Sequence, residues 1–128
     1  MKNTLPKTES LKSKKLIRLL FESGKSEFTY PFKILYKVVD FDENHPAQYM
    51  ISVSKKRIRT AVGRNHVKRL FRESYRKNKH PLHETLLNRD KKLALVFIFV
   101  GKPNIKYQQM EVRMKIALAS LTEKMQKI

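Results

Sequence analysis

Residues 51–79, ISVSKKRIRTAVGRNHVKRLFRESYRKNK, combine an apolar repeat with eleven Lys and Arg side chains and a single acid, Glu73. If residues 61–77 form a helix, successive side chains turn by about 100° around its axis. One face then carries Val67, Leu70, Phe71, Ser74 and Tyr75, and the flank and back carry Arg64, Lys68, Arg69, Arg72 and Arg76. Such a helix can bury its apolar face in a core and present fixed positive charges to a polyanion.

The composition of the 128-residue chain indicates one folded domain with an anionic partner. Hydrophobic residues make up 41% of the chain, and 29 basic against 11 acidic side chains give a formal charge of +18. No run approaches about 18 apolar residues, and the N-terminus lacks the apolar core of a signal peptide. We therefore expect a cytoplasmic protein without a membrane span. The chain has no cysteine, which excludes disulfides and thiolate metal sites.

The first half of the chain predicts a leader, a helix and three strands. Residues 1–10 are polar and contain Pro6, so we expect a flexible leader. Ser13 can cap a helix that runs to residue 22 and stops at Gly24, with Leu16, Leu20 and Phe21 facing the core. Alternating residues then predict strands at residues 25–30, 32–39 and 48–54, the last two joined by a hairpin loop at residues 40–46.

The second half completes an α+β fold of order α-β-β-β-α-β-α. Residues 78–92 lack an apolar period and contain Pro81, so we expect a loop. Residues 93–100 are consecutively apolar, which predicts a strand buried on both faces, and residues 107–125 form an amphipathic helix. We expect a two-layer sandwich in which helices pack on a small mixed sheet, with a βαβ crossover through the basic helix. Such crossovers are right-handed in about 98% of cases.

The titratable residues do not form a convincing protein active site. Asp40, Asp42 and Glu43 suit a solvated hairpin tip better than a cation site, and His80 and His83 flank Pro81 without further ligands nearby. A protein-only nuclease dependent on a carboxylate such as Asp42 stays a minor alternative. A non-catalytic ribosomal or ribosome-assembly protein would share the charge and the α+β fold.

The aromatic residues give a weaker signal for RNA binding. They cluster on the first helix and the strands that follow it: Phe21, Phe28, Tyr30, Phe32 and Tyr36. Unpaired bases stack on such rings, but small sheets also bury aromatic side chains in their cores. For any one of these residues, core packing is the favoured interpretation.

Two segments, ISVSKK at residues 51–56 and AVGRNHVKRLFRE at residues 61–73, resemble the protein component of bacterial ribonuclease P in spacing and identity. FESGKS at residues 21–26 is similar to the end of that family's first helix, and residues 32–36 to its cleft strand. The resemblance implies a protein that binds a catalytic RNA and the 5′ leader of precursor tRNA, which the RNA cleaves with magnesium ions. It also implies a left-handed crossover, no metal bound by the protein alone, and no obligate protein partner.

The resemblance assigns residues to two surfaces. Contact with the RNA subunit is implied for Lys55, Lys56, Arg59, Arg64, Asn65, Lys68, Arg69 and Arg72. The wall of the leader cleft is implied for Phe21, Phe32 and Tyr36. Two positions depart from the family pattern, since His66 replaces a usual Arg and Ile17 stands where an aromatic is common. Gly63 also weakens the start of the basic helix by about 1 kcal/mol relative to Ala, so we expect the helix to begin at Arg64.

Overall fold

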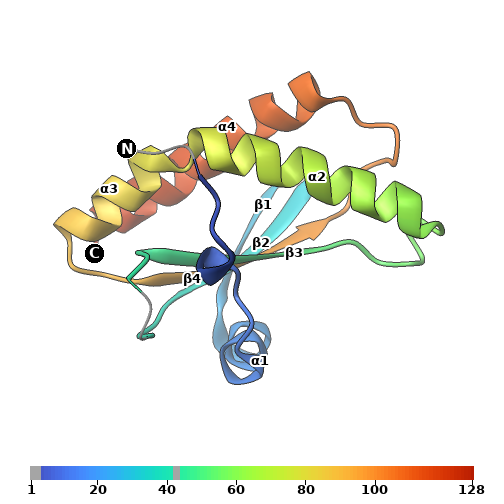
Figure 1. Ribbon diagram of the computed structural model, residues 1–128. Helices are drawn as coiled ribbons and strands as arrows, with labels where there is room; N and C mark the ends of the chain where they lie inside the picture. Colours follow the sequence, from blue (N-terminus) through green and yellow to red (C-terminus); the bar gives the residue numbers. More distant parts are fainter. Residues whose placement is uncertain (1–3, 42–43) are drawn as a thin grey trace.

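A computed structural model describes residues 4–41 and 44–128, and its elements follow the predicted order with one added helix (Figure 1). The helical elements are a 3₁₀ turn η1 (Lys7–Glu9), α1 (Lys14–Ser23), α2 (Ala61–Asn78), α3 (His80–Asn88) and α4 (Tyr107–Gln126). The strands are β1 (Lys25–Thr29), β2 (Phe32–Val38), β3 (Ala47–Ser52) and β4 (Leu93–Phe99). The α+β class and the mixed sheet are confirmed.

The sheet has the strand order β1-β2-β4-β3, and β4 occupies an inner position. β4 pairs antiparallel with β2 and parallel with β3, so the predicted hairpin between β2 and β3 is wrong. Alternation within a strand specifies its faces but not its neighbours. The all-apolar β4 is the strand best suited to an inner place, because both of its faces are covered. β3, α2 and β4 do form a parallel crossover, and its left-handed sense stays a prediction.

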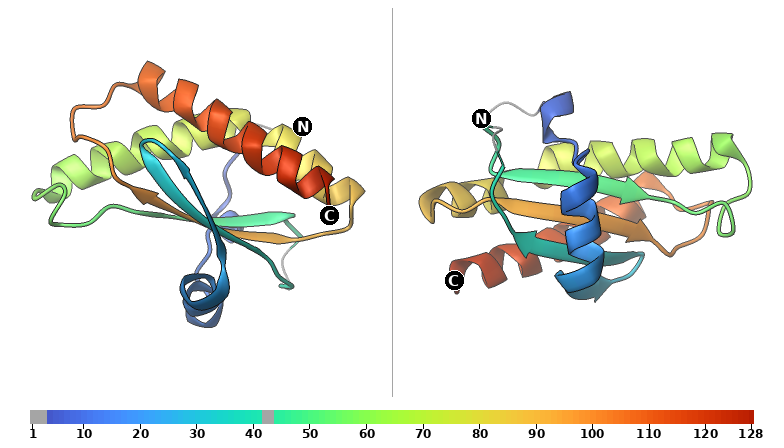
Figure 2. Two further views of the ribbon diagram at one scale, coloured as in Figure 1. Left: turned by 180° about the vertical axis from the view of Figure 1, so that it is seen from behind. Right: turned by 90° about the horizontal axis from the view of Figure 1, so that it is seen from below.

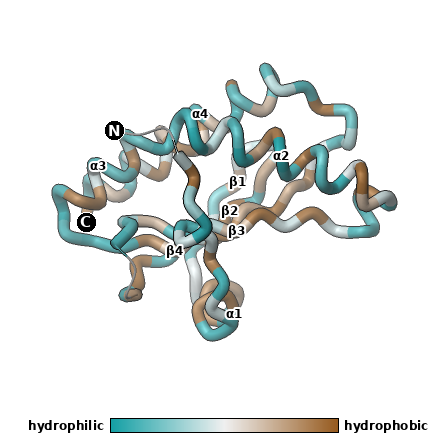
Figure 3. Tube along the Cα trace, in the orientation of Figure 1, coloured by the Kyte–Doolittle hydropathy of each residue, from teal (hydrophilic) through white to brown (hydrophobic). Residues whose placement is uncertain are grey.

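Helices cover both faces of the sheet. Figures 1 and 2 show α2, α3 and α4 on one face and α1 on the other. The sheet and α2–α4 are the two expected layers, and α1 adds a smaller cover. Along β2, Phe32, Ile34 and Tyr36 enter the main core beneath α2 and α4, whereas Leu35 joins a second cluster with Leu20 of α1. In Figure 3 the strands at the centre are largely brown, and α2 and α4 alternate brown and teal.

The basic helix α2 begins three residues earlier than expected. Thr60 caps it, since the Thr60 hydroxyl accepts a hydrogen bond from the Gly63 backbone N–H at 3.0 Å. A Cβ at position 63 would lie 2.7 Å from Ile58 Cγ2 and 2.9 Å from Thr60 Oγ1. Ile58 is buried beneath this first turn. The glycine therefore allows the cap to close, which outweighs its low helix propensity.

The helix α3 occupies most of residues 78–92, where a loop was expected, so that prediction is wrong. Pro81 lies in its first turn, where the missing N–H of proline costs no helical hydrogen bond. Leu82, His83 and Leu86 are buried against the core, at the spacing of a single helical face. An amphipathic pattern of only nine residues gives a weak signal in the sequence.

Residues 4–10, predicted as part of a flexible leader, are instead fixed against the fold, and residues 1–3 lie outside the described part. The Glu9 carboxylate is 1% exposed and lies 2.6 Å from Lys79 Nζ. Gln48 Nε2 donates to the Thr8 carbonyl at 3.0 Å, and the Leu11 N–H donates to the Tyr49 carbonyl at 2.7 Å. These bonds attach the segment to β3 and to the junction of α2 and α3.

Burial of His83 predicts a loss of stability in mild acid. His83 is 7% exposed. Its Nε2 forms a hydrogen bond of 3.3 Å with the Tyr75 hydroxyl and lies 3.8 Å from a Glu9 carboxylate oxygen. Burial lowers the pKa of His83 from 6.5 to about 3, assisted by the positive charge of Lys79 and by His80 and His45. Glu9 does not offset this, because its charge is already paired with Lys79.

The unfolded chain therefore binds a proton at His83 near pH 6.5 that the folded chain does not bind. The contribution of neutral His83 is complete above pH 6.5, and we expect the free energy of unfolding to decrease by up to about 1.4 kcal/mol per pH unit below it. Denaturant unfolding between pH 5 and pH 7 measures this slope. His83→Gln should flatten it and the matched surface variant His66→Gln should not; identical slopes in both variants would contradict the assignment.

Candidate nucleic-acid interface

The cations predicted to meet an RNA lie on the solvent side of α2 and in the loop before it. Lys55, Lys56 and Arg59 of the loop and Asn65, Arg69 and Arg72 of the helix are exposed, and Arg64 and Lys68 are half-buried. The opposite face of α2 is buried as predicted through Val67, Phe71, Ser74 and Tyr75, with Leu70 packed at its edge. Burial of one face thus fixes the direction in which the charges point.

This surface keeps its positive charge because its single acid is already paired. Glu73 lies 2.5 Å from Arg76 Nη2 and 3.5 Å from Lys77 Nζ. The hydrogen bond from Arg76 lowers the pKa of Glu73, so the carboxylate stays ionised and bound to these neighbours. Within residues 4–41 and 44–128, no ion pair involves the loop cations or Lys68, Arg69 and Arg72. Their charges remain available to a ligand.

Arg64 has a second role, because it shapes the loop that carries the other cations. Its Nη1 donates to the carbonyl oxygens of Ile58 at 3.0 Å and Arg59 at 2.9 Å. The Arg57 N–H donates to the Ser54 hydroxyl at 3.2 Å, which fixes the start of the same loop. The guanidinium therefore holds the loop against the first turn of α2, and its remaining N–H groups can still donate to phosphate.

His66 is exposed on α2 and lies beside a cation of the same surface. Its Nδ1 is 3.3 Å from Arg69 Nη2. Arginine can only donate, so Nδ1 is the acceptor in this arrangement. At this position the chain thus offers a hydrogen-bonding ring oriented by Arg69, in place of a second guanidinium.

The three aromatic residues assigned to the leader cleft do not share a surface. Phe32 is fully buried, with edge contacts to the rings of Phe71 at 5.7 Å and Phe97 at 5.6 Å, so its assignment to a cleft wall is wrong. Tyr36 is 7% exposed in the same core, and Lys124 Nζ lies 5.5 Å from its ring centre. Phe21, predicted to face the core, is instead 57% exposed on α1, on the opposite side of the sheet.

Strand alternation explains the burial of Phe32 and Tyr36 and identifies the β2 side chains that face the other way. Because Phe32, Ile34 and Tyr36 point toward α2 and α4, Lys33 and Leu35 point toward α1. Leu35 and Met50 pack in the cluster on that side. The period-two signal in the sequence specifies two faces of β2, and the structure shows that Phe32, Ile34 and Tyr36 lie on the face covered by α2 and α4.

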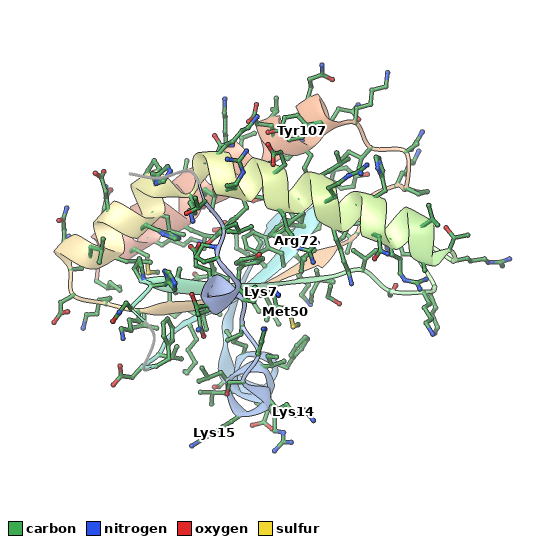
Figure 4. The ribbon with its side chains drawn as sticks, viewed as in Figure 1. Lys7, Lys14, Lys15, Met50, Arg72 and Tyr107 are labelled. Atoms are coloured by element: carbon green, nitrogen blue, oxygen red, sulfur yellow. The ribbon has the colours of Figure 1, made fainter. Side chains whose placement is uncertain are left out.

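A hollow of about 610 Å³ lies on the α1 side, between η1, the start of α1 and β3. Its lining includes three lysines and one acid, together with the helix cap and an edge-strand amide: Lys7, Lys12, Ser13, Lys15, Asp40 and Gln48. Figure 4 shows Lys7 and Met50 between the lysines of α1 and Arg72 of α2.

Tyr49 of β3 lies between these two basic surfaces. Burial raises the pKa of its hydroxyl, and hydrogen bonds with Ser10 and Arg72 oppose the rise. The basic surfaces of α1 and α2 therefore adjoin along β3.

The described residues offer neither a metal centre nor a membrane span. Across residues 4–41 and 44–128, no group of three or more His, Asp or Glu side chains is arranged to hold a metal ion. Asp42 and Glu43, named for a cation site and a nuclease carboxylate, lie outside this part of the chain. The described helices are all too short or too polar to cross a bilayer. What the arrangement provides is a cationic surface suited to phosphate.

Comparison with known proteins supports this interpretation. The family model described as Ribonuclease P matches residues 5–125. The ribonuclease P protein component of Porphyromonas gingivalis strain ATCC 33277 is 37% identical over 117 residues, covering 89% of this chain and 83% of that protein. The component from Chlorobium phaeobacteroides is 45% identical over 83 residues, covering 62% of this chain and 57% of the relative.

Solved structures show the same fold. The Staphylococcus aureus RNase P protein aligns with a TM-score of 0.68 at 20% identity, covering 88% of this chain and 94% of that one. The RNase P protein from Thermotoga maritima aligns with a TM-score of 0.64 at 23% identity, covering 93% and 96%. At these identities the agreement concerns architecture, including the mixed sheet and its helical cover.

Proposed function

Because this chain belongs to the ribonuclease P protein family and serves tRNA 5′ maturation as the protein subunit, we propose that α2 and its preceding loop bind the catalytic RNA. The observation that carries this assignment is the charge of the loop and of Lys68, Arg69 and Arg72, which no acid of the described part of the chain pairs, beside a Glu73 that already has partners. The proposed contact residues are Lys55, Lys56, Arg59, Arg64, Asn65, Lys68, Arg69 and Arg72. Each phosphate they neutralise releases counterions, so binding should weaken steeply as salt rises.

The single-stranded leader of precursor tRNA binds, in our proposal, on the α1 side of the sheet. Phe21 keeps its assigned role there, since its exposed ring can stack on an unpaired base. The lysines that line the hollow at the start of α1 would bind leader phosphates in this arrangement. This surface meets the α2 surface along β3, so one protein can hold both RNAs next to each other. Electrostatic repulsion between the two RNAs decreases accordingly.

The chemistry belongs, in our proposal, to the RNA. The described side chains supply no cluster suited to magnesium, and we assign the metal ions to the RNA subunit and its substrate. The chain then acts as one RNA-binding domain that positions the two RNAs and screens their charges. The holoenzyme is the endoribonuclease. We place this particle in the cytoplasm, the usual site of bacterial tRNA maturation.

Reconstitution tests the proposal. Adding the protein to the cognate RNA subunit should allow cleavage of precursor tRNA at a magnesium concentration where the RNA alone is slow, because the cations of the protein replace part of the ionic screening. Product formation on a gel measures the rate. Protein alone should not cleave, and pre-treatment of the complex with a ribonuclease should abolish the activity. Unchanged cleavage on addition of the protein, or cleavage that survives ribonuclease treatment, would refute the division of labour.

A further inference from the structure

A second basic groove runs along the end of β4 and continues from the loop that precedes α2. It consists of two hollows, of about 660 Å³ and about 540 Å³, that share Lys102 in their linings. The first lies between the β1–β2 turn and the start of α4, and the second lies beside the loop that leads to α2. Each volume is within the range of about 300–1,000 Å³ typical of small-ligand sites, so each can admit a nucleotide.

Backbone hydrogen bonds fix the segments that form this groove. The Val100 N–H donates to the Pro31 carbonyl at 2.7 Å, and Arg57 Nη1 donates to the Val100 carbonyl at 2.9 Å. A Cβ at Gly101 would lie 2.7 Å from Pro31 Cβ and 2.8 Å from the Phe99 ring, so the close approach requires a glycine there. The β1–β2 turn and the basic loop before α2 are thus attached to one strand end.

The charge of the groove is positive throughout. Its two linings contain five cations, Lys56, Arg57, Lys102, Lys106 and Arg113, and no carboxylate. None of the five takes part in an ion pair within the described residues. An extended anionic ligand matches a groove of this charge. A protein partner would not require the aromatic ring and the amide side chains that also line it.

Those other features suit a nucleobase. Tyr30 is 46% exposed at the wall of the larger hollow, and its ring offers a stacking platform. Asn104 and Gln108 line the same hollow and carry amides that can both donate and accept, as base edges require. Val112, 57% exposed, adds apolar surface beside them. Cations, amides and an aromatic ring together are the chemistry of single-stranded RNA binding.

We propose that this groove binds an unpaired strand of the catalytic RNA subunit, with a base stacked on Tyr30 and phosphates near Lys102 and Arg113. The choice of RNA rests on the proposed function. The smaller hollow contains Lys56 of the loop assigned to that RNA, and the groove continues from it, whereas the leader surface lies on the α1 side. The groove thereby extends the RNA-subunit contact from α2 to α4.

Site-specific cross-linking tests the proposal with the full chain. Tyr30→benzoylphenylalanine, irradiated in complex with the cognate RNA subunit, should cross-link to that RNA at an unpaired nucleotide, equally with and without precursor tRNA. A probe at Asn65 on α2 reports formation of the complex, and a probe at the exposed Leu87 on α3 should not cross-link.

Each outcome has a defined meaning. Cross-linking at Asn65 but not at Tyr30, or cross-linking of Tyr30 to precursor tRNA alone, would overturn this proposal and leave the proposed function standing. Loss of cross-linking at both positions would count against the two together. A second copy of the chain or another protein in the groove would appear as a protein cross-link, and would also overturn it.

Charge reversal gives an independent measurement. Arg113→Glu should lower affinity for the RNA subunit about tenfold and reduce the salt slope by about one or two, because a phosphate contact becomes a repulsion. The matched variant Lys91→Glu changes an exposed cation in the turn between α3 and β4, at the other end of β4 from the groove. It should change affinity less than threefold. Equal losses of affinity in the two variants would show that net charge alone determines binding and would overturn the proposed groove contact.

Discussion

Replacing Lys68, Arg69 and Arg72 together with alanine is expected to lower affinity for the catalytic RNA about 100-fold near 0.15 M salt. The three side chains lie on one face of α2, and none is in an ion pair among the described residues, although Arg69 contacts His66 and Arg72 hydrogen-bonds Tyr49. Each lost phosphate contact should reduce the slope of log affinity against log salt by about 0.9. Three contacts therefore remove about 2.7 from the slope.

Titration of labelled RNA subunit at several salt concentrations measures both quantities. A control with the same change of charge replaces Lys91, Lys115 and Lys127, which are exposed outside α2. This control should lose less than fivefold, and thermal unfolding should confirm that both variants remain folded. A similar loss in the two triple variants would mean that the net charge of the chain, and not the α2 face, determines binding.

The basic helix was predictable because several local signals agree. The apolar period specifies the buried side of α2, and that in turn fixes where the cations point. Only its start was misjudged, since the propensity of Gly63 ignores the space needed by the Thr60 cap. The amphipathic helix predicted at residues 107–125 was likewise confirmed as α4, whose buried face consists of Met110, Met114, Ala117, Leu118, Leu121 and Met125.

Features that depend on distant partners were not predictable from the same patterns. The place of β4 between β2 and β3 depends on which strand gains most from burial on two faces. The burial of Phe32 was not predictable, because alternation gives two equivalent faces until a helix covers one. The N-terminal segment was misjudged for a related reason. Its anchor is the contact of Glu9 with Lys79, which lies seventy positions away in the sequence.

The pair of Glu9 and Lys79 gives the largest expected effect on stability. Lys79→Met removes the cation 2.6 Å from a carboxylate whose side chain is 1% exposed. The second oxygen of that carboxylate, Oε1, has no hydrogen-bond partner among the residues that the structure describes. The variant therefore leaves a buried carboxylate without its lysine, 3.8 Å from a ring nitrogen of His83, and we expect a loss of about 3–5 kcal/mol in the free energy of unfolding. Denaturant unfolding at pH 7 measures it.

Two further variants separate this cause from a loss of packing. Lys127→Met removes the cation of an exposed pair with Glu123 at 3.4 Å and should cost less than about 1 kcal/mol. Adding Glu9→Gln to Lys79→Met should restore a large part of the stability, because a neutral amide is less costly to bury than a lone carboxylate. A double variant no more stable than Lys79→Met would show that the lysine acts through packing alone.

The same pair determines how firmly the N-terminal segment is held. Lys79 Nζ also donates to the Thr4 carbonyl at 2.5 Å, so Lys79→Met releases two anchors of residues 4–10 at once. Amide hydrogen exchange should accelerate at the Leu11 N–H, which bonds to β3, more than in the paired strands β2 and β4. Since this segment borders the hollow proposed for the leader, Lys79→Met should weaken leader binding while contact with the RNA subunit persists. Unchanged exchange at Leu11 would contradict the anchoring role of the pair.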